Sequence, residues 1–145
     1  MKKFIYIIVL FLYVDSKMIR DATNEVVFDT TTKKMWQDDS KVKDINYKVS
    51  WEAAIEVCEN LDLGGFTDWR LPNKNELNTI VDLSKYDPSL SEIFIKYDLS
   101  SYWSSTNYGN STALNKAWSI NFTTGDTRAD QTKTELLYVR CVRDL

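Results

Sequence analysis

The stretch that decides the fold is Ser50–Leu77, SWEAAIEVCENLDLGGFTDWRLPNKNEL. Ser50 is a favoured N-cap residue, and the apolar residues after it recur at the spacing of a helix that faces a core. Gly64 and Gly65 then supply the permissive backbone that ends a helix and turns the chain. We therefore expect a first helix with a buried stripe formed by Trp51, Ala54, Ile55, Cys58 and Leu61.

A second helix is expected at the end of the same stretch. Asn73 and Glu76 form an N-x-x-E capping pattern ahead of Leu77, and apolar residues continue at positions 80 and 81. The helix should end near residues 86–88, because Pro88 restricts the residue before it away from helical geometry.

The segment between the two helices contains Asp68, Trp69 and Arg70. One interpretation is a binding cluster, since Arg and Trp dominate the energetics of many interfaces. The other is a segment that positions the helices, with Arg70 paired to a carboxylate or to backbone carbonyls. We favour the second interpretation.

Alternating apolar patterns predict strands on both sides of the helices. They cover residues 25–29, 34–37, 102–106, 117–122 and 136–143, of which the first two form a hairpin and the last three an antiparallel set. Residues 90–99 fit either a short helix or irregular chain. This order predicts an α+β fold, with two helices packed on a small antiparallel sheet. The inward faces should hold Trp51, Trp103 and Trp118.

The chain has two cysteines, Cys58 and Cys141, without the spacing of a CxxC motif. Two cysteines in an exported chain most simply form one disulfide, which would join the first helix to the last predicted strand. A pair of free catalytic thiols is the alternative.

The N-terminus carries a targeting pattern. Lys2 and Lys3 precede an apolar run over residues 4–14, which is too short to span a bilayer, and a cleavage pattern fits after Ser16. The sequence predicts a signal peptide over 1–16 and one domain over 17–145, with an uncleaved anchor or a buried strand as alternatives. We expect a secreted, periplasmic or surface protein with no stable membrane span after cleavage.

Composition excludes several function classes. The 145 residues contain no histidine, which removes Ser-His-Asp and Cys-His catalysis and the commonest zinc ligand. The net charge is −3, and the first 20 residues have four basic and one acidic side chain, which leaves −6 for the remainder. That sign argues against a nucleic-acid partner. The local exception, residues 33–48, is lysine-rich and fits a solvated loop or a contact with an acidic glycan.

Six ordered blocks resemble the Lcl C-terminal domain family, a family of exported bacterial domains. They are KMWQD (34–38), residues 51–70, LPNKNEL (71–77), YWSST (102–106), AWSINFTTG (117–125) and YVRCVR (138–143). The resemblance implies a fold similar to C-type lectins and to formylglycine-generating enzymes, in which a cysteine of the first helix commonly pairs with one on the last strand. The copper-binding cysteine pair of those enzymes and the Trp-Asn-Asp triplet of calcium-dependent lectins have no counterpart here.

Two long polar segments, residues 107–116 and 124–134, are the expected binding loops, because loops on a rigid scaffold commonly carry binding residues. They offer a planar ring and hydrogen-bonding groups. The candidate ligand-binding residues are Tyr108, Asn110, Asn115, Asp126, Arg128 and Asp130.

From these observations we expect an exported, non-catalytic binding or adhesion module that recognises a glycan or a protein surface. No catalytic residue, metal ligand or cofactor is predicted. The alternatives are an enzyme of the formylglycine-generating type, an unrecognised hydrolase, or a structural module of a surface assembly.

Overall fold

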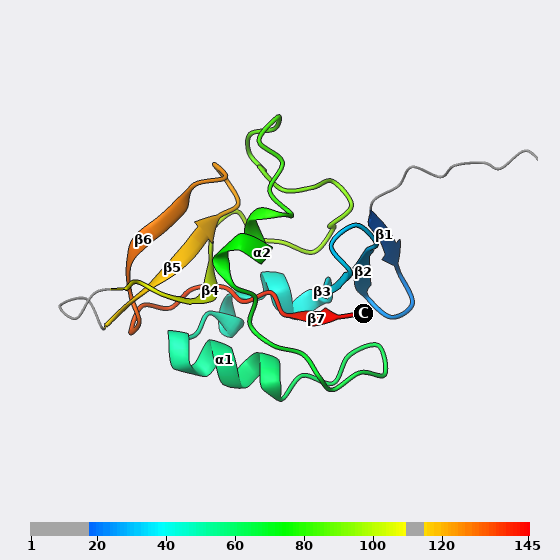
Figure 1. Cartoon of the computed structure of the whole chain (residues 1–145), viewed down its shortest axis with the longest axis horizontal. Helices are drawn as coiled ribbons and strands as arrows, with labels where there is room; N and C mark the ends of the chain where they lie inside the picture. The colour runs from blue at the N-terminus through cyan, green and yellow to red at the C-terminus, as the bar shows by residue number, and fades with distance from the viewer. Residues whose placement is uncertain (1–17, 110–114) are drawn as a thin grey trace, which may run out of the picture.

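The computed structural model describes residues 18–109 and 115–145. The predicted signal peptide and Asn110 lie outside these ranges. The described chain is a mixed α+β domain with two small antiparallel sheets, which lie on the left and right of Figure 1. The predicted α+β class is therefore confirmed, although the strands form two sheets instead of one.

The first sheet has the order β1-β2-β3-β7, and its strands are β1 (Met18–Asp21), β2 (Val26–Asp29), β3 (Lys34–Gln37) and β7 (Val142–Asp144). The predicted hairpin is β2–β3, in which Val26 faces Gln37 and Asp29 faces Lys34. The Asp29 carboxylate accepts hydrogen bonds from the backbone amides of residues 31 and 32, which closes the turn. β1 is an additional edge strand that the sequence pattern did not indicate.

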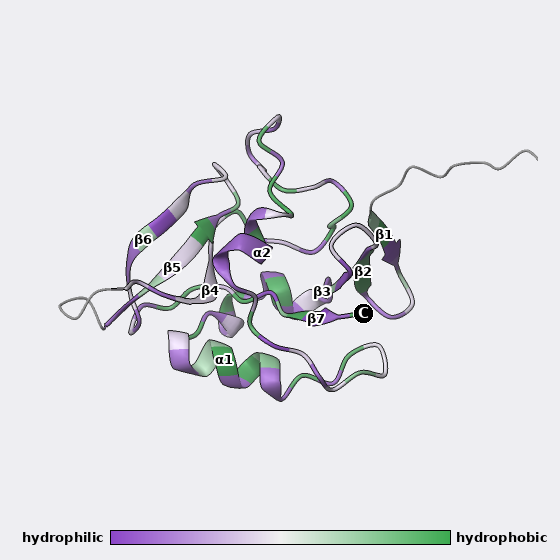
Figure 2. Ribbon diagram, in the orientation of Figure 1, coloured by the Kyte–Doolittle hydropathy of each residue, from purple (hydrophilic) through white to green (hydrophobic). Residues whose placement is uncertain are grey.

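The second sheet has the order β4-β5-β6, with β4 (Ser101–Asn107), β5 (Lys116–Asn121) and β6 (Thr127–Thr132). The first two strands match the predicted segments, but the third does not. β6 comes from the segment expected to be a binding loop. Its sequence, TRADQT, has no apolar alternation and is mostly hydrophilic in Figure 2, because it is an edge strand held mainly by backbone pairing with β5.

The prediction of one strand over residues 136–143 is wrong for most of its length. Leu137 forms an isolated bridge to Val49, Tyr138 forms one to Tyr102, and regular pairing begins only at Val142. Residues 137–142 are all buried, since this segment crosses between the two sheets. Burial on every side explains why a pattern that resembles a half-buried strand was misleading.

Helix α1 (Trp51–Glu59) begins where the cap predicts, with the Ser50 hydroxyl accepting from the Ala53 amide at 3.4 Å. Helix α2 (Lys74–Asn78) has the predicted capping box between Asn73 and Glu76. It ends earlier than predicted, because Val81 pairs in a bridge with Leu90 and the chain leaves helical geometry. Two short 3-10 helices, η1 (Ser40–Lys43) and η2 (Ile45–Tyr47), precede α1.

The two helices cover opposite faces of the second sheet. Ala54 and Cys58 of α1 pack with Trp103 in one core cluster, whereas Leu77 of α2 packs with Tyr102 in the other. Neighbouring residues of β4 thus point to different cores, as strand geometry requires. Trp103 is fully buried as predicted, but Trp51 and Trp118 are only partly buried. Residues 90–99 form irregular chain.

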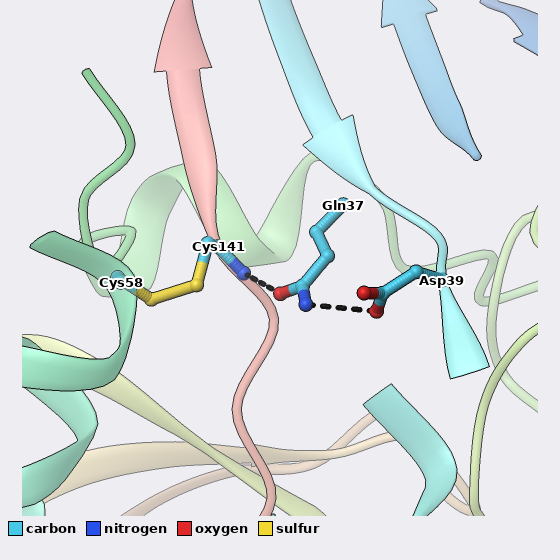
Figure 3. Close-up of a disulfide and its surroundings, with 4 residues drawn as sticks. All are labelled: Gln37, Asp39, Cys58 and Cys141. Atoms are coloured by element: carbon cyan, nitrogen blue, oxygen red, sulfur yellow. Dashed lines mark hydrogen bonds between the residues drawn. A yellow bond between two sulfur atoms is a disulfide. The ribbon is translucent and has the colours of Figure 1, made fainter. Parts of the chain in front are cut away.

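Cys58 and Cys141 form the predicted disulfide, with their Cα atoms 5.4 Å apart (Figure 3). Both residues are fully buried. The sequence separation of 83 residues makes the loop-closure contribution to stability about 4–5 kcal/mol in the chain-entropy model. A disulfide of this kind indicates that the chain folds in an oxidising compartment.

Candidate functional site

Arg140 lies at the junction of the two sheets and is fully buried. Its Nη1 donates to the Gln37 carbonyl at 2.6 Å and to the Asp38 carboxylate at 3.2 Å, and its Nη2 donates to the Lys96 carbonyl. The guanidinium carbon lies 4.5 Å from the centre of the Phe94 ring. A buried charge is tolerated only with such partners, so Arg140 joins the last segment to β3 and to the irregular chain before β4.

Asp38 completes this network. Its carboxylate also accepts from Arg20 Nε at 2.6 Å and from the backbone amides of Ile95 and Lys96 at 3.3 and 3.1 Å. Asp38 has 0% exposure, so water does not contact its carboxylate, and four donor residues compensate its charge. The sequence analysis did not single out Asp38 or Arg140, whose pairing joins residues 102 positions apart.

Arg70 has the structural role that we favoured. Its guanidinium bonds both oxygens of Glu76, at 2.8 and 2.7 Å, and Asp144 and Lys34 join the same cluster. Burial alone would raise the pKa of Glu76, but hydrogen bonds from Arg70 and the Asn73 amide outweigh it and lower that pKa. Glu76 is thus held ionised, and it ties the start of α2 to the first sheet.

Asp68 and Trp69 are also structural. Asp68 accepts two hydrogen bonds from Arg143, at 2.6 and 3.0 Å, which lower the pKa of its carboxyl group. The Arg143 guanidinium carbon lies 3.9 Å from the centre of the Phe66 ring. Trp69 is 2% exposed and donates its indole N–H to the Phe66 carbonyl at 3.0 Å. These interactions tie the segment between the helices to β7 and to the chain at Phe66.

The candidate loop residues lie at different places along the second sheet. Tyr108 and Asn115 lie at the end where β4 leads into β5, since the Tyr108 amide donates to Lys116 and the Lys133 amide donates to Asn115. Asp126 lies in the turn at the opposite end of β5. Its backbone amide donates to the Thr124 hydroxyl, and that hydroxyl donates to the Asp126 carboxylate. One small ligand could not contact both ends of the sheet.

Arg128 and Asp130 are both exposed on the edge strand β6. Arg128 pairs in register with Ser119. A hydrogen bond from Gln131 is the main cause that lowers the pKa of Asp130, and the charges of Arg128 and Lys116 lower it further. Asp130 is therefore an ionised carboxylate close to two cations.

The β4–β5 end carries a group of aromatic and lysine side chains that we call the aromatic end. It consists of Trp51, Lys74, Tyr108, Trp118 and Lys133. The Tyr108 and Trp118 rings meet edge to face at 5.8 Å, and Lys74 Nζ lies 4.0 Å from the centre of the Trp118 ring. On the α1 side of the sheet, Lys133 Nζ lies 3.9 Å from the centre of the Trp51 ring.

Ser104 of β4 holds the two halves of the aromatic end together. Its carbonyl accepts from Trp51 Nε1 at 2.8 Å, and its hydroxyl donates to the Trp118 carbonyl at 2.8 Å. Tyr108 is 36% exposed, and no carboxylate pairs with Lys74 or Lys133 in the described part of the chain. Of the aromatic end, sequence reasoning identified only Tyr108 as a ligand contact. Nothing in the sequence around Lys74, Trp118 or Lys133 indicates that these residues lie beside Tyr108 and Trp51.

Within residues 18–109 and 115–145, no three acidic or cysteine side chains gather closely enough to hold a metal ion. No helix among the described residues has the length and apolar character needed to cross a bilayer.

The fold and its paired charges define a disulfide-bonded α+β domain in which the segment between the helices is tied to the last strand. The chain belongs to the Lcl C-terminal domain family, whose family model matches residues 25–143. The matched range begins just before β2 and ends within β7, so it includes the disulfide, both helices and the aromatic end. A comparison with curated proteins finds no match.

Proposed function

We propose that this protein is an exported, non-catalytic binding or adhesion module with a C-type-lectin-like fold, and that it recognises a glycan or a protein surface through the aromatic end. The observation that carries the proposal is the pair of rings formed by Tyr108, which is 36% exposed, and the partly buried Trp118, beside Lys74, which has no carboxylate partner among the described residues. The disulfide between α1 and the last segment supports the fold assignment, because that pairing is common in such folds.

The chemistry of the aromatic end suits a ligand with an apolar face and polar edges. Aromatic rings pack against the C–H face of a sugar or against a side chain, while lysines and amides bond the groups around it. Tyr108 supplies the exposed ring, Lys74 a cation, and Asn115 an exposed amide at the same end of the sheet. Arg128 and Asp130 would extend the contact along β6.

An enzyme of the formylglycine-generating type is the second candidate. Such an enzyme needs a reactive cysteine pair in its substrate site. Here Cys58 and Cys141 are bonded to each other and have 0% exposure, which favours the binding proposal. A structural module of a surface assembly is the third candidate, and it would use the same exposed surface for assembly.

A glycan and extracellular-matrix array, followed by titration of the strongest ligand, tests the proposal. Tyr108→Ala and Trp118→Ala should each weaken binding by about 1 kcal/mol or more, roughly fivefold. Tyr86→Ala is the matched control, because Tyr86 is 74% exposed in the loop between α2 and β4. A chelator such as EDTA should not change the affinity.

Two outcomes would contradict this assignment. If Tyr86→Ala weakens binding as much as Tyr108→Ala, the aromatic end is not the contact. If substitutions of Lys41 and Lys43 abolish binding while the aromatic-end variants bind normally, the lysine-rich segment 33–48 is the contact.

A further inference from the structure

A cavity of about 190 Å³ lies on the α1 side of the domain, apart from the aromatic end. Its apolar wall consists of Val57 of α1, Leu61 just after it, and Val139 of the last segment. Tyr47 of η2 borders it and is 39% exposed. The volume equals that of roughly six water molecules in the liquid, which suits a molecule of amino-acid size and is too small for a disaccharide.

Gln37 provides a buried polar group in this wall. Its side-chain oxygen accepts from the Cys141 amide at 3.0 Å, and its nitrogen donates to Asp39 at 2.9 Å (Figure 3). A side-chain amide has two N–H donors, and these bonds use one of them. Gln37 is 3% exposed and lines the cavity, so its side-chain amide adds a buried polar group to the apolar wall.

Two opposite charges border the same cavity, Lys41 of η1 and Asp62 after α1. The ion pairs of the described residues include neither of them, whereas Arg20, Arg70, Arg140 and Arg143 all have carboxylate partners. The Lys41 ammonium lies 5.9 Å from the centre of the Tyr47 ring, and the Asp62 carboxylate has no hydrogen-bond donor among the described residues. A ligand with one negative and one positive group would pair with both.

We propose that this cavity binds a free α-amino acid with an apolar side chain. Lys41 pairs with the carboxylate, Asp62 with the ammonium group, and Val57, Leu61 and Val139 contact the side chain. The end of a peptide carries only one of the two charges and would leave the other residue unpaired, so a free amino acid fits better than a chain terminus. This inference is independent of the aromatic end, since none of its residues lines the cavity.

Calorimetric titration of the purified full chain with L-leucine tests the proposal. We expect saturable one-to-one binding. Leucinamide, which lacks the carboxylate, N-acetyl-leucine, which lacks the ammonium group, and glycine, which lacks the side chain, should each bind at least tenfold more weakly. Lys41→Gln and Asp62→Asn should each weaken leucine binding about tenfold, the loss expected for a charge-assisted hydrogen bond.

Lys43→Gln is the matched control, because Lys43 belongs to the same 3-10 helix as Lys41 but does not line the cavity. It should leave leucine binding unchanged, and all three variants should keep the unfolding temperature of the parent. The proposal is overturned if leucine shows no saturable binding at millimolar concentration, or if Lys43→Gln weakens binding as much as Lys41→Gln. Equal affinity for leucinamide or N-acetyl-leucine would also overturn it, and would indicate a site for a peptide end.

Discussion

Around Arg140, at the junction of the two sheets, charged groups pair with groups of opposite sign and are sealed from water. At the aromatic end, lysines lie over indole rings and no carboxylate among the described residues pairs with them. The first arrangement leaves little for an outside molecule to bind, because both terminal nitrogens of Arg140 already have acceptors inside the protein, and Arg140 Nε, which has no partner among the described residues, is buried. The second leaves cations and ring faces whose interactions can be exchanged for those of a ligand. We therefore assign the paired charges of this domain to its architecture, and our proposal assigns the lysines of the aromatic end to recognition.

The largest effect is expected from breaking the buried network. Asp38→Ala leaves Arg140 buried without its carboxylate and removes the acceptor of Arg20 Nε and of two backbone amides. Removal of one partner of a buried ion pair costs about 3–5 kcal/mol of stability. Urea denaturation at neutral pH measures this loss. A loss below about 1 kcal/mol would mean that water enters the junction and that the network is not sealed.

The disulfide should contribute almost as much. Cys58→Ser should lower the free energy of unfolding by about 2–5 kcal/mol, the range for loss of a native disulfide from a small secreted domain. Cys141→Ser is the matched variant and should give a similar loss, because the two changes open the same loop. Titration of the native parent with a thiol reagent should find no reactive thiol before denaturation and reduction.

The buried tyrosines predict a loss of stability at high pH. Burial raises the pKa of Tyr102 to about 12, above its ordinary value of 10.0. The unfolded chain therefore releases this proton first. The contribution of the protonated Tyr102 side chain to the free energy of unfolding is complete below about pH 10, and it is lost as the pH rises toward 12. At about 1.4 kcal/mol per pKa unit, the loss for Tyr102 reaches about 2–3 kcal/mol.

Tyr102→Phe isolates this contribution. Its free energy of unfolding should fall less steeply between pH 10 and 12 than that of the parent, although the variant starts lower because the Asp98 amide loses its acceptor. Tyr86→Phe, at an exposed position, should follow the parent curve. Identical slopes for Tyr102→Phe and the parent would contradict the assignment of the effect to Tyr102.

These comparisons also show which parts of the molecule a sequence can predict. Ser50 and Asn73 predicted the starts of α1 and α2 because a cap acts within three residues of itself. The hairpin of β2 and β3 was predicted for the same local reason. β6 was missed, because an edge strand held by its backbone needs no apolar alternation.

Long-range partners were harder to predict. Arg140 and Asp38 are 102 positions apart, and nothing local to either residue indicates the other. The disulfide was an exception, because the chain has only two cysteines and therefore one intramolecular pairing. At the surface, Tyr108 was selected because it lies in a polar loop, whereas Trp118 was assigned to the core from its strand pattern and is in fact only partly buried, with Lys74 over its ring.

The smallest effect on stability is expected at the aromatic end. It is the most direct test of the difference between this surface and the buried network around Arg140. Tyr108→Ala removes a side chain that is 36% exposed, and its cost should stay within about 0.5 kcal/mol, as surface changes usually do. Lys133→Gln removes the cation over Trp51, an interaction worth about 0.5–1 kcal/mol at an exposed site. Thermal and urea denaturation of both variants, measured beside Asp38→Ala, should therefore separate the two regions by at least about 2 kcal/mol. If Tyr108→Ala instead destabilises the domain as strongly as Asp38→Ala, the ring is part of the core packing, and the aromatic end should be assigned to architecture and not to recognition.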